Sequence, residues 1–192
     1  MLLTTHHSQL NGIDFVSAFT MKLPETFVPG SKHINVIIET PKGSGNKYTY
    51  DPETQLFKLS KILPQGLSFP LHFGFIPGTR GDDGDPLDVL VLMDEPSYPG
   101  NLIECTVLGV IEAKQTEKNG ETMRNDRLIA AAIESHRYKE FKSLGDLDKY
   151  MLEEIINFFE NYNAMSNKKF TVLRNQGPQT ALKLIKTQMN NE

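Results

Sequence analysis

Three aspartates stand close together in the stretch DGDPLD, at Asp83, Asp85 and Asp88, directly before an apolar run. Gly84 frees the backbone within this stretch and Pro86 fixes it, so a bend can turn the three carboxylates toward one point. Carboxylates in such proximity repel one another, and their pKa values rise unless a cation lies between them. Hard oxygen ligands suit Mg²⁺, Mn²⁺ or Ca²⁺ better than they suit zinc. The stretch is therefore a candidate binding site for one of these divalent cations.

A simpler interpretation of the same stretch is a solvated turn. Asp-Gly and Asp-Pro pairs are common in turns, and aspartates before a strand usually do no more than solvate a loop. An EF-hand loop does not fit the spacing. A loop that begins at Asp82 has Gly84 where an oxygen ligand is required. One that begins at Asp83 is interrupted by Pro86-Leu87 and lacks a closing glutamate.

The elements that must position these side chains are mainly short strands. β-Branched and apolar runs bounded by turn residues predict strands at 33–41, 47–51, 55–63, 87–93 and 102–113. The Gly-, Pro- and aromatic-rich segment 68–86 predicts irregular structure or a bent strand, and the polar segment 114–125 predicts a loop. Residues 127–133 fit a helix because of their alanines and a strand because of their position.

Two helices follow the strands. Apolar residues at helical spacing predict a helix after Asp146, its expected N-cap, and a second helix that begins near Pro178. A strand at 167–176 separates them. This order predicts an α+β fold, in which a small closed or partly closed β-barrel packs against the two C-terminal helices. Residues 1–30 lack a clear periodicity and form an N-terminal arm, which leaves one domain at 31–192.

The composition excludes several classes of protein. The chain has 192 residues, a net charge of −4 and one cysteine, Cys105. This balance gives no reason to expect a nucleic-acid or anionic-membrane partner, and the apolar runs are far shorter than a membrane span. The N-terminus lacks the basic and apolar regions of a signal peptide, so we expect a cytoplasmic protein whose lone thiol is structural.

The stretch DGDPLDVLVL closely resembles the signature of the soluble family I inorganic pyrophosphatases. Other segments similar to that family follow in the expected order and cover about residues 33–188: VIIETP with NKYTYD, FPLHFGFIPGT, PGNLIECTVLGVIE and INFFENYN. The resemblance implies a small OB-like closed β-barrel of mostly antiparallel strands flanked by helices. It implies hydrolysis of pyrophosphate to two phosphates by a water held between Mg²⁺ ions, with Mn²⁺ as the alternative metal. It also implies a homo-oligomer, either a hexamer or a dimer.

The resemblance assigns roles to individual residues of this chain. Asp85 matches the general base that faces the attacking water. The positions that match metal ligands, or residues near the metals, are Asp83, Asp88, Glu39 and Glu117. The positions that match phosphate ligands are Lys47, Lys61, Arg127 and Tyr162. Charge-assisted contacts from lysine and arginine suit the oxygens of pyrophosphate.

One further metal ligand is ambiguous. The family has a loop of the form Asp-x-x-Gly followed by Asp-x-Lys, and in this chain Glu117 stands at the first position and Arg127 at the lysine. Strict spacing to Arg127 makes Asn125 the second ligand, whereas metal chemistry prefers the carboxylate of its neighbour Asp126. We expect Asp126 to be the ligand.

Other positions depart from the family pattern. Where the family has a glutamate, an arginine, a tyrosine and a lysine, this chain has Thr49, Lys61, Phe73 and Asn163. A lysine keeps the charge of an arginine but loses its bidentate geometry. Cations that could compensate, chosen by charge and not by position, are Arg80, Arg124 and Lys58.

These departures leave two alternatives to a pyrophosphatase. One is a hydrolase of the same fold that acts on another di- or polyphosphate, and the other is a non-catalytic phosphate- or metal-binding protein. The presence of Asp85 together with metal and phosphate residues argues against the second, because a binding protein needs no general base.

Overall fold

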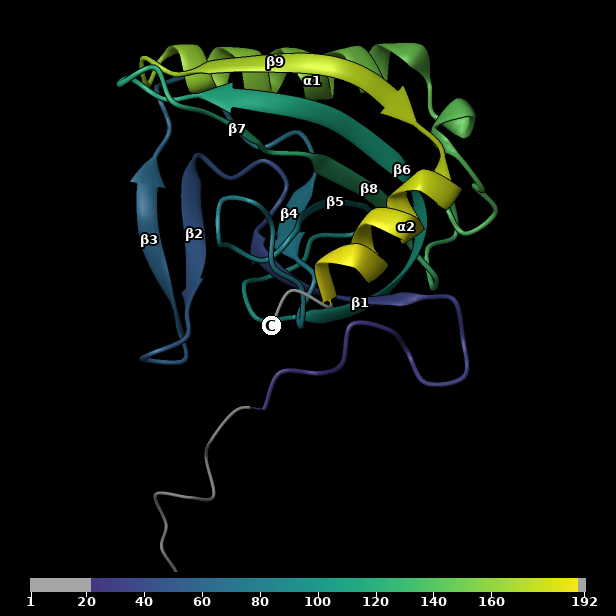
Figure 1. Ribbon diagram of the computed structural model, residues 1–192. Helices are drawn as coiled ribbons and strands as arrows, with labels where there is room; N and C mark the ends of the chain where they lie inside the picture. Colours follow the sequence, from purple (N-terminus) through teal and green to yellow (C-terminus); the bar gives the residue numbers. More distant parts are fainter. Residues whose placement is uncertain (1–21, 190–192) are drawn as a thin grey trace, which may run out of the picture.

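The computed structural model of the chain describes residues 22–189, and Figure 1 shows how its strands and helices are arranged. Most of the predicted N-terminal arm, residues 1–21, lies outside the described residues. The end of the arm runs against β1 (Ile34–Thr40), where Phe27 forms a bridge with Ile34. Thr26 Oγ1 also donates a 2.7 Å hydrogen bond to the backbone carbonyl of Pro77. The last residues of the arm are therefore held on the surface of the domain.

Among the described residues, seven strands form one sheet. In pairing order they are β1, β4 (His72–Phe75), β5 (Asp88–Leu92), β8 (Arg127–Ala132), β6 (Leu102–Thr116) and β7 (Thr122–Arg124), with β9 (Lys169–Gln176) also on β6. β1 pairs with β6 as well as with β4, so the pairing of β1, β4, β5, β8 and β6 returns on itself. The pairs are antiparallel except β5 with β8, which is parallel. The predicted α+β class with mostly antiparallel strands is confirmed.

A separate hairpin stands beside this sheet in Figure 1. Its strands, β2 (Asn46–Asp51) and β3 (Leu56–Ile62), pair antiparallel, as their alternating sequence predicts. Lys47 lies opposite Lys61 in the register of the hairpin. The hairpin therefore brings two of the predicted phosphate ligands together at one end.

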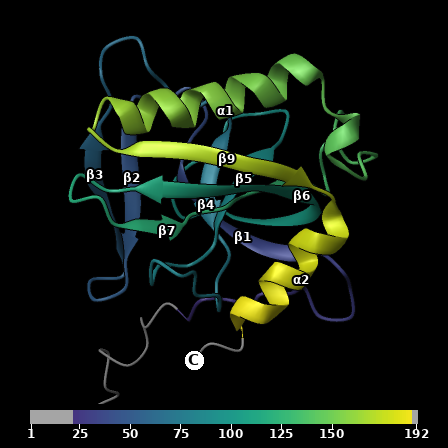
Figure 2. The same cartoon turned by 45° about the horizontal axis from the view of Figure 1, so that its top comes forward.

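Two α-helices cover the sheet. α1 (Lys149–Ala164) lies alongside β9, and α2 (Pro178–Met189) packs against β6, as Figures 1 and 2 show. α2 begins at Pro178 as predicted, because a helix tolerates proline in its first turn, where the backbone N–H has no helical partner. Among the described residues, no helix combines the length and the apolar character needed to cross a membrane.

The predicted N-cap of α1 is wrong. The N-cap is Asp148, whose carboxylate accepts a 2.7 Å hydrogen bond from the backbone N–H of Tyr150. Asp146 instead ends a short preceding 3-10 helix, η2 (Leu144–Asp146), and its carboxylate accepts from the backbone N–H of Ser143 at 2.8 Å. Asp148 is thus the N-cap of α1, whereas Asp146 reaches back to Ser143, the N-cap of η2. Both carboxylates satisfy N–H groups at a helix N-terminus that have no helical partner.

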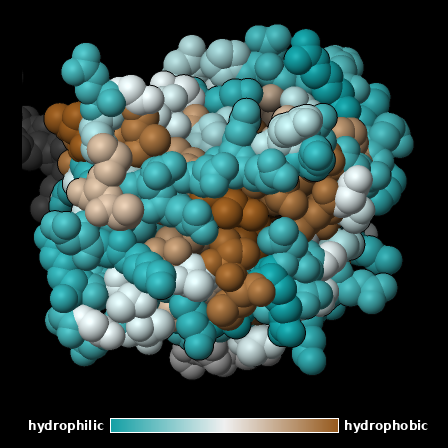
Figure 3. Space-filling view, turned by 90° about the horizontal axis from the view of Figure 1, so that it is seen from above, coloured by the Kyte–Doolittle hydropathy of each residue, from teal (hydrophilic) through white to brown (hydrophobic). Residues whose placement is uncertain are grey.

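The sheet buries apolar side chains on both of its faces. Alternate residues of β5 and β8 join the cluster with α1, namely Leu90, Leu92, Ile129 and Ala131. The residues between them join the cluster with α2, namely Val89, Val91, Leu128 and Ala130. A strand that is buried on both faces reads as a continuous apolar run, which explains why 127–133 also fitted a helix. The face above α1 and β9 shows apolar side chains between bands of hydrophilic ones (Figure 3).

The predicted loop at 114–125 is also wrong. β6 continues through Thr116, and the chain returns as β7, so the segment is a hairpin. Glu117 N–H closes its turn by donating to the Glu121 carbonyl at 2.8 Å, and Gly120 supplies a positive φ of 88°. β6 gains its extra length by pairing with β9, a long-range contact that the polar composition does not reveal.

Candidate active site

A cavity of about 550 Å³ opens between the sheet, the β2–β3 hairpin and the turn that follows α1. Its lining comes from segments that are far apart in the sequence. Among the predicted site residues it contains Glu39, Lys47, Lys61, Asp83, Asp85, Asp88, Glu117, Arg127 and Tyr162. The structure therefore brings together every predicted site residue except Asp126.

The DGDPLD stretch forms the tight bend that its sequence predicts. Gly84 has a φ of +89°, and Gly81 N–H donates to the Asp85 carbonyl at 2.7 Å across the bend. The Asp83 carboxylate accepts from the backbone N–H of Asp85 at 3.3 Å. Burial raises the pKa of Asp83, and the charges of the neighbouring aspartates raise it further. The bend thus concentrates negative charge at the entrance to β5.

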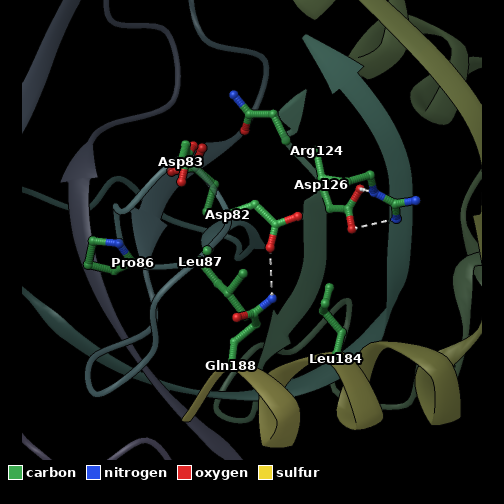
Figure 4. A pocket seen from close by; sticks show the side chains of 11 residues that line it. Asp82, Asp83, Pro86, Leu87, Arg124, Asp126, Leu184 and Gln188 are labelled. Carbon is green, nitrogen blue, oxygen red and sulfur yellow. Dashed lines mark hydrogen bonds and ion pairs between the residues drawn. The ribbon is translucent and has the colours of Figure 1, made fainter. Parts of the chain in front are cut away.

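The end of α2 supports this bend from the other side. The Arg80 N–H donates to the carbonyl of Gln188 at 3.1 Å, and Gln188 Nε2 donates to Asp82 Oδ1 at 3.4 Å. Figure 4 shows this second contact as a dashed line between the helix and the loop. Asp82 therefore contacts α2 and does not line the large cavity.

Glu39 lies at an irregularity in β1, where the pairing with β4 shifts between Ile38 and Thr40. Such a bulge re-aims a side chain, and here Glu39 lies on the cavity wall with 6% of the residue exposed. Its Oε1 accepts from the backbone N–H of Tyr50 at 2.6 Å. Burial raises the pKa of Glu39 to about 7, and the nearby Asp88 carboxylate adds to the rise.

Arg127 is the most deeply buried cation of the site, with 5% of its surface exposed. Its guanidinium forms an ion pair with Asp88 at 2.7 Å and lies over the rings of Phe159 and Phe170, 4.9 and 5.6 Å from their centroids. It also donates to the side-chain carbonyl of Asn125. Stacking on the aromatic rings fixes the plane of the guanidinium. A lysine at this position would have no planar group to orient in this way.

The remaining cations lie against aromatic rings of the cavity wall. Lys61 Nζ is 4.3 Å from the centroid of the Tyr162 ring and is hydrogen-bonded to Ser166. Lys47 Nζ lies 5.3 Å from the centroid of the Phe73 ring. Phe73 is 1% exposed, so this position supplies a surface for the lysine but no hydroxyl donor.

Asn125 and Asp126 are placed differently relative to the cavity. Asn125 lines both the large cavity and a neighbouring pocket of about 220 Å³ (Figure 4), whereas Asp126 lines only the neighbouring pocket, which Asp83 and Asp88 also line. The Asp126 carboxylate accepts from Ala113 N–H at 2.9 Å and from Arg124 at 3.1 and 2.8 Å. Of the two residues, only Asn125 lines the large cavity. The role of either residue as a metal ligand stays a prediction.

Two of the positions that depart from the family pattern, Asn163 and Thr49, form hydrogen bonds within the protein. Asn163 is 2% exposed, and its amide donates to the Phe159 carbonyl at 2.8 Å within α1. Thr49 Oγ1 donates to Ser60 at 2.9 Å. The three cations chosen by charge do not line the cavity, namely Arg80, Arg124 and Lys58. Residues on the wall that sequence reasoning missed are Gln115, Ser166 and Lys168. No local pattern distinguishes them, because long-range folding brings them there.

The donor set of the cavity fits Mg²⁺. Within residues 22–189, no three carboxylate, imidazole or thiol groups are close enough to form a complete metal cluster by themselves. The carboxylates are instead spread around one cavity. Mg²⁺ keeps several waters in proteins and is held by one or two carboxylates together with substrate phosphates, so a spread donor set suits it. Burial and like charges raise the pKa values of Glu39 and Asp83. A cation bound near these carboxylates would neutralise their negative charge and favour the ionised form.

Comparison with known proteins gives the same family as the residues of the cavity. The family model described as inorganic pyrophosphatase matches residues 36–192. The chain belongs to the inorganic pyrophosphatase family. The predicted membership of this family is therefore confirmed.

Individual inorganic pyrophosphatases are similar to the chain over most of their own length. The one from Halalkalibacterium halodurans is 41% identical over 154 residues, which cover 80% of this chain and 91% of that protein. The one from Synechocystis is 35% identical over 163 residues, or 85% and 94% of the two chains. The crystal structure of the inorganic pyrophosphatase from Thermus thermophilus matches with a TM-score of 0.78 and 33% identity, over 87% and 94% of the two chains.

Proposed function

We infer that the chain hydrolyses inorganic pyrophosphate to two phosphates in the large cavity, with Mg²⁺ as its cofactor. The observation that carries this inference is the composition of the cavity wall. Carboxylates come from β1, the DGDPLD bend and the β6–β7 hairpin, while lysine, arginine and tyrosine come from the β2–β3 hairpin, β8, and α1 with the turn after it. A polyanionic substrate bound through divalent cations needs both kinds of group.

Asp85 is the proposed general base. It lies on the cavity wall at the tip of the bend, between the metal-ligand candidates Asp83 and Asp88. Its carboxylate takes the proton of the attacking water. When bound, divalent cations neutralise the charge of pyrophosphate and lower the pKa of that water.

The proposed phosphate ligands hold the two ends of the substrate. Lys47 and Lys61 approach from the hairpin, Arg127 from β8 and Tyr162 from α1. Arg127 donates in a fixed plane because its guanidinium is stacked, whereas the two lysines act as mobile point charges.

The proposed metal ligands are Asp83 and Asp88, with Glu39 and Glu117 beside them. We assign the position of the further ligand to Asn125, because Asn125 lines the large cavity and Asp126 does not. The Asn125 side-chain oxygen accepts from Arg127, while the Asp126 carboxylate accepts from Arg124 and Ala113, so either residue would exchange such a contact for the metal. An amide oxygen is a neutral ligand, so this site carries one negative charge less than a site with aspartate.

Replacement of the base tests the proposal. In Asp85→Asn, the side chain keeps its shape but cannot accept the proton, so turnover of pyrophosphate should fall about 10²- to 10⁴-fold while Mg²⁺ binding persists. Asp82→Asn is the matched control, since Asp82 belongs to the same loop but contacts α2. Both variants are assayed for phosphate release and for Mg²⁺ binding by calorimetry. Near-normal turnover in Asp85→Asn would remove Asp85 from this role.

We further propose that the ring of paired strands is a closed OB-like barrel and that the chain is a homo-oligomer, either a hexamer or a dimer. Support for self-association comes from the outer strand of the hairpin, β3, where Leu59 and Ile62 are 52% and 70% exposed. Light scattering on the purified protein measures the molar mass. A mass that corresponds to one chain would contradict the proposal.

A further inference from the structure

The turn between α1 and β9 places a lysine on the wall of the cavity. Lys168 Nζ lies 2.8 Å from each carboxylate oxygen of Glu117, which is on the tip of the β6–β7 hairpin. This ion pair lowers the pKa of Glu117. The side chain of Lys168 is 34% exposed, so its ammonium is accessible from the cavity.

The backbone of the turn directs Lys168 back toward the end of α1. Asn167 adopts a positive φ of 55°, and the Lys168 N–H donates to the Asn163 carbonyl at 3.0 Å. Asn163 also lines the cavity, but its side chain is neutral and its buried amide donates within the helix. The turn thus brings a cation to the end of the helix at which residue 163 provides none.

We propose that Lys168 binds a phosphate group of pyrophosphate and supplies the positive charge that is missing at position 163. This inference rests on the proposed function. A lysine ammonium has three donors, so Lys168 can keep one hydrogen bond to Glu117 and give another to a phosphate oxygen. Ser166, from the same turn, holds Lys61. The turn therefore provides one cation and positions a second.

A purely structural role for Lys168 would have different consequences. If it only holds Glu117, its loss should change the Mg²⁺ concentration that the enzyme needs and leave the affinity for pyrophosphate as it is. If Lys168 binds phosphate, its loss should weaken the binding of pyrophosphate itself. The two roles are thus distinguished by measuring the Mg²⁺ requirement and the affinity for pyrophosphate separately.

The test compares Lys168→Met with Lys168→Arg, which keeps the charge, and with Lys169→Met. Lys169 is the adjacent, exposed lysine, and it does not line the cavity. The readouts are the KM for pyrophosphate and, by calorimetry at saturating Mg²⁺, the Kd for methylenediphosphonate, an analogue that is not hydrolysed. Lys168→Met should raise both about 10- to 100-fold, as expected for one charge-assisted hydrogen bond. Lys168→Arg should stay near the wild type, and Lys169→Met should equal it.

Two results would overturn the inference. One is a Kd for the analogue that is the same in Lys168→Met and Lys169→Met, and the other is a change confined to the Mg²⁺ requirement. Thermal melting confirms that the variants are folded, which we expect because both lysines are at least partly exposed. Absence of Mg²⁺-dependent phosphate release in the wild type would refute the proposed function instead, and binding of the analogue would still test Lys168.

Discussion

The carboxylates of the cavity differ in how their charge is balanced. Asp88 is paired with Arg127, and Glu117 is paired with Lys168. Within residues 22–189, Glu39 and Asp83 take part in no ion pair, and both have raised pKa values. Negative charge that the protein itself leaves unneutralised is where a divalent cation gains most from binding.

The raised pKa of Glu39 makes the stability of the metal-free protein depend on pH. The unfolded chain releases this proton near pH 4.5, whereas the folded protein holds it until about pH 7. The contribution of Glu39 to stability is therefore fully present below pH 4.5 and is lost as the pH rises to 7, by on the order of 3 kcal/mol. Glu39→Gln, which stays neutral, should lose this part of the pH dependence.

Urea unfolding in EDTA at pH 5 and at pH 8 measures the effect. The free energy of unfolding should fall more in the wild type than in Glu39→Gln, because other groups that titrate in this range are common to both. Equal decreases in the two proteins would show that Glu39 ionises normally in the fold.

The choice between Asn125 and Asp126 gives a second prediction for single residues. Asp126→Asn should lower stability, because Arg124 loses its closest carboxylate, but it should leave the Mg²⁺ requirement unchanged. Asn125→Asp should lower the Mg²⁺ concentration for half-maximal activity several-fold, since it adds a charged oxygen to the cavity wall. Titration of the activity of both variants with Mg²⁺ shows which of the two residues is the metal ligand. A higher requirement in Asp126→Asn would restore Asp126 as the ligand.

At the scale of elements, the approach of β4 to β1 fixes the position of Glu39. A Cβ on Gly74 would lie 2.1 Å from the Ile37 carbonyl oxygen, so a larger residue would force the two strands apart at the bulge. Gly74→Ala should destabilise the protein by roughly 1–3 kcal/mol. Gly45→Ala is the control, because a Cβ there would make an ordinary 3.8 Å contact. Urea midpoints that agree for the two variants would contradict this view of the bulge.

The elements also show how much of the fold and site the sequence predicts. The DGDPLD bend was predictable because a glycine and a proline act locally, and β1, β5 and most of β6 were predictable from their apolar runs. β4 lay in a segment predicted to be irregular or a bent strand, and β8 fitted a helix as well as a strand. The hairpin at 114–125 was not predictable, since its first strand, β6, is held there by pairing with β9. Lys168 reaches the cavity for the same reason: long-range contacts place it, and the sequence near it has no distinctive pattern.

At the scale of the whole molecule, the cavity lies where three parts meet. The ring of strands contributes the carboxylates of β1 and β5, the β2–β3 hairpin contributes two lysines, and α1 with its turn contributes Tyr162 and Lys168. Acidic and basic side chains thus line one space, and in places they are paired directly, Asp88 with Arg127 and Glu117 with Lys168. That arrangement suits an anion that binds together with its metal ions, because it offers groups for both.

The most direct test of this account is phosphate release from pyrophosphate by the purified protein, measured with Mg²⁺ and again with EDTA. The account predicts rapid release with Mg²⁺, its loss in EDTA, and slower release from nucleoside triphosphates and longer polyphosphates under the same conditions. No release from pyrophosphate, or faster release from one of the other substrates, would contradict it.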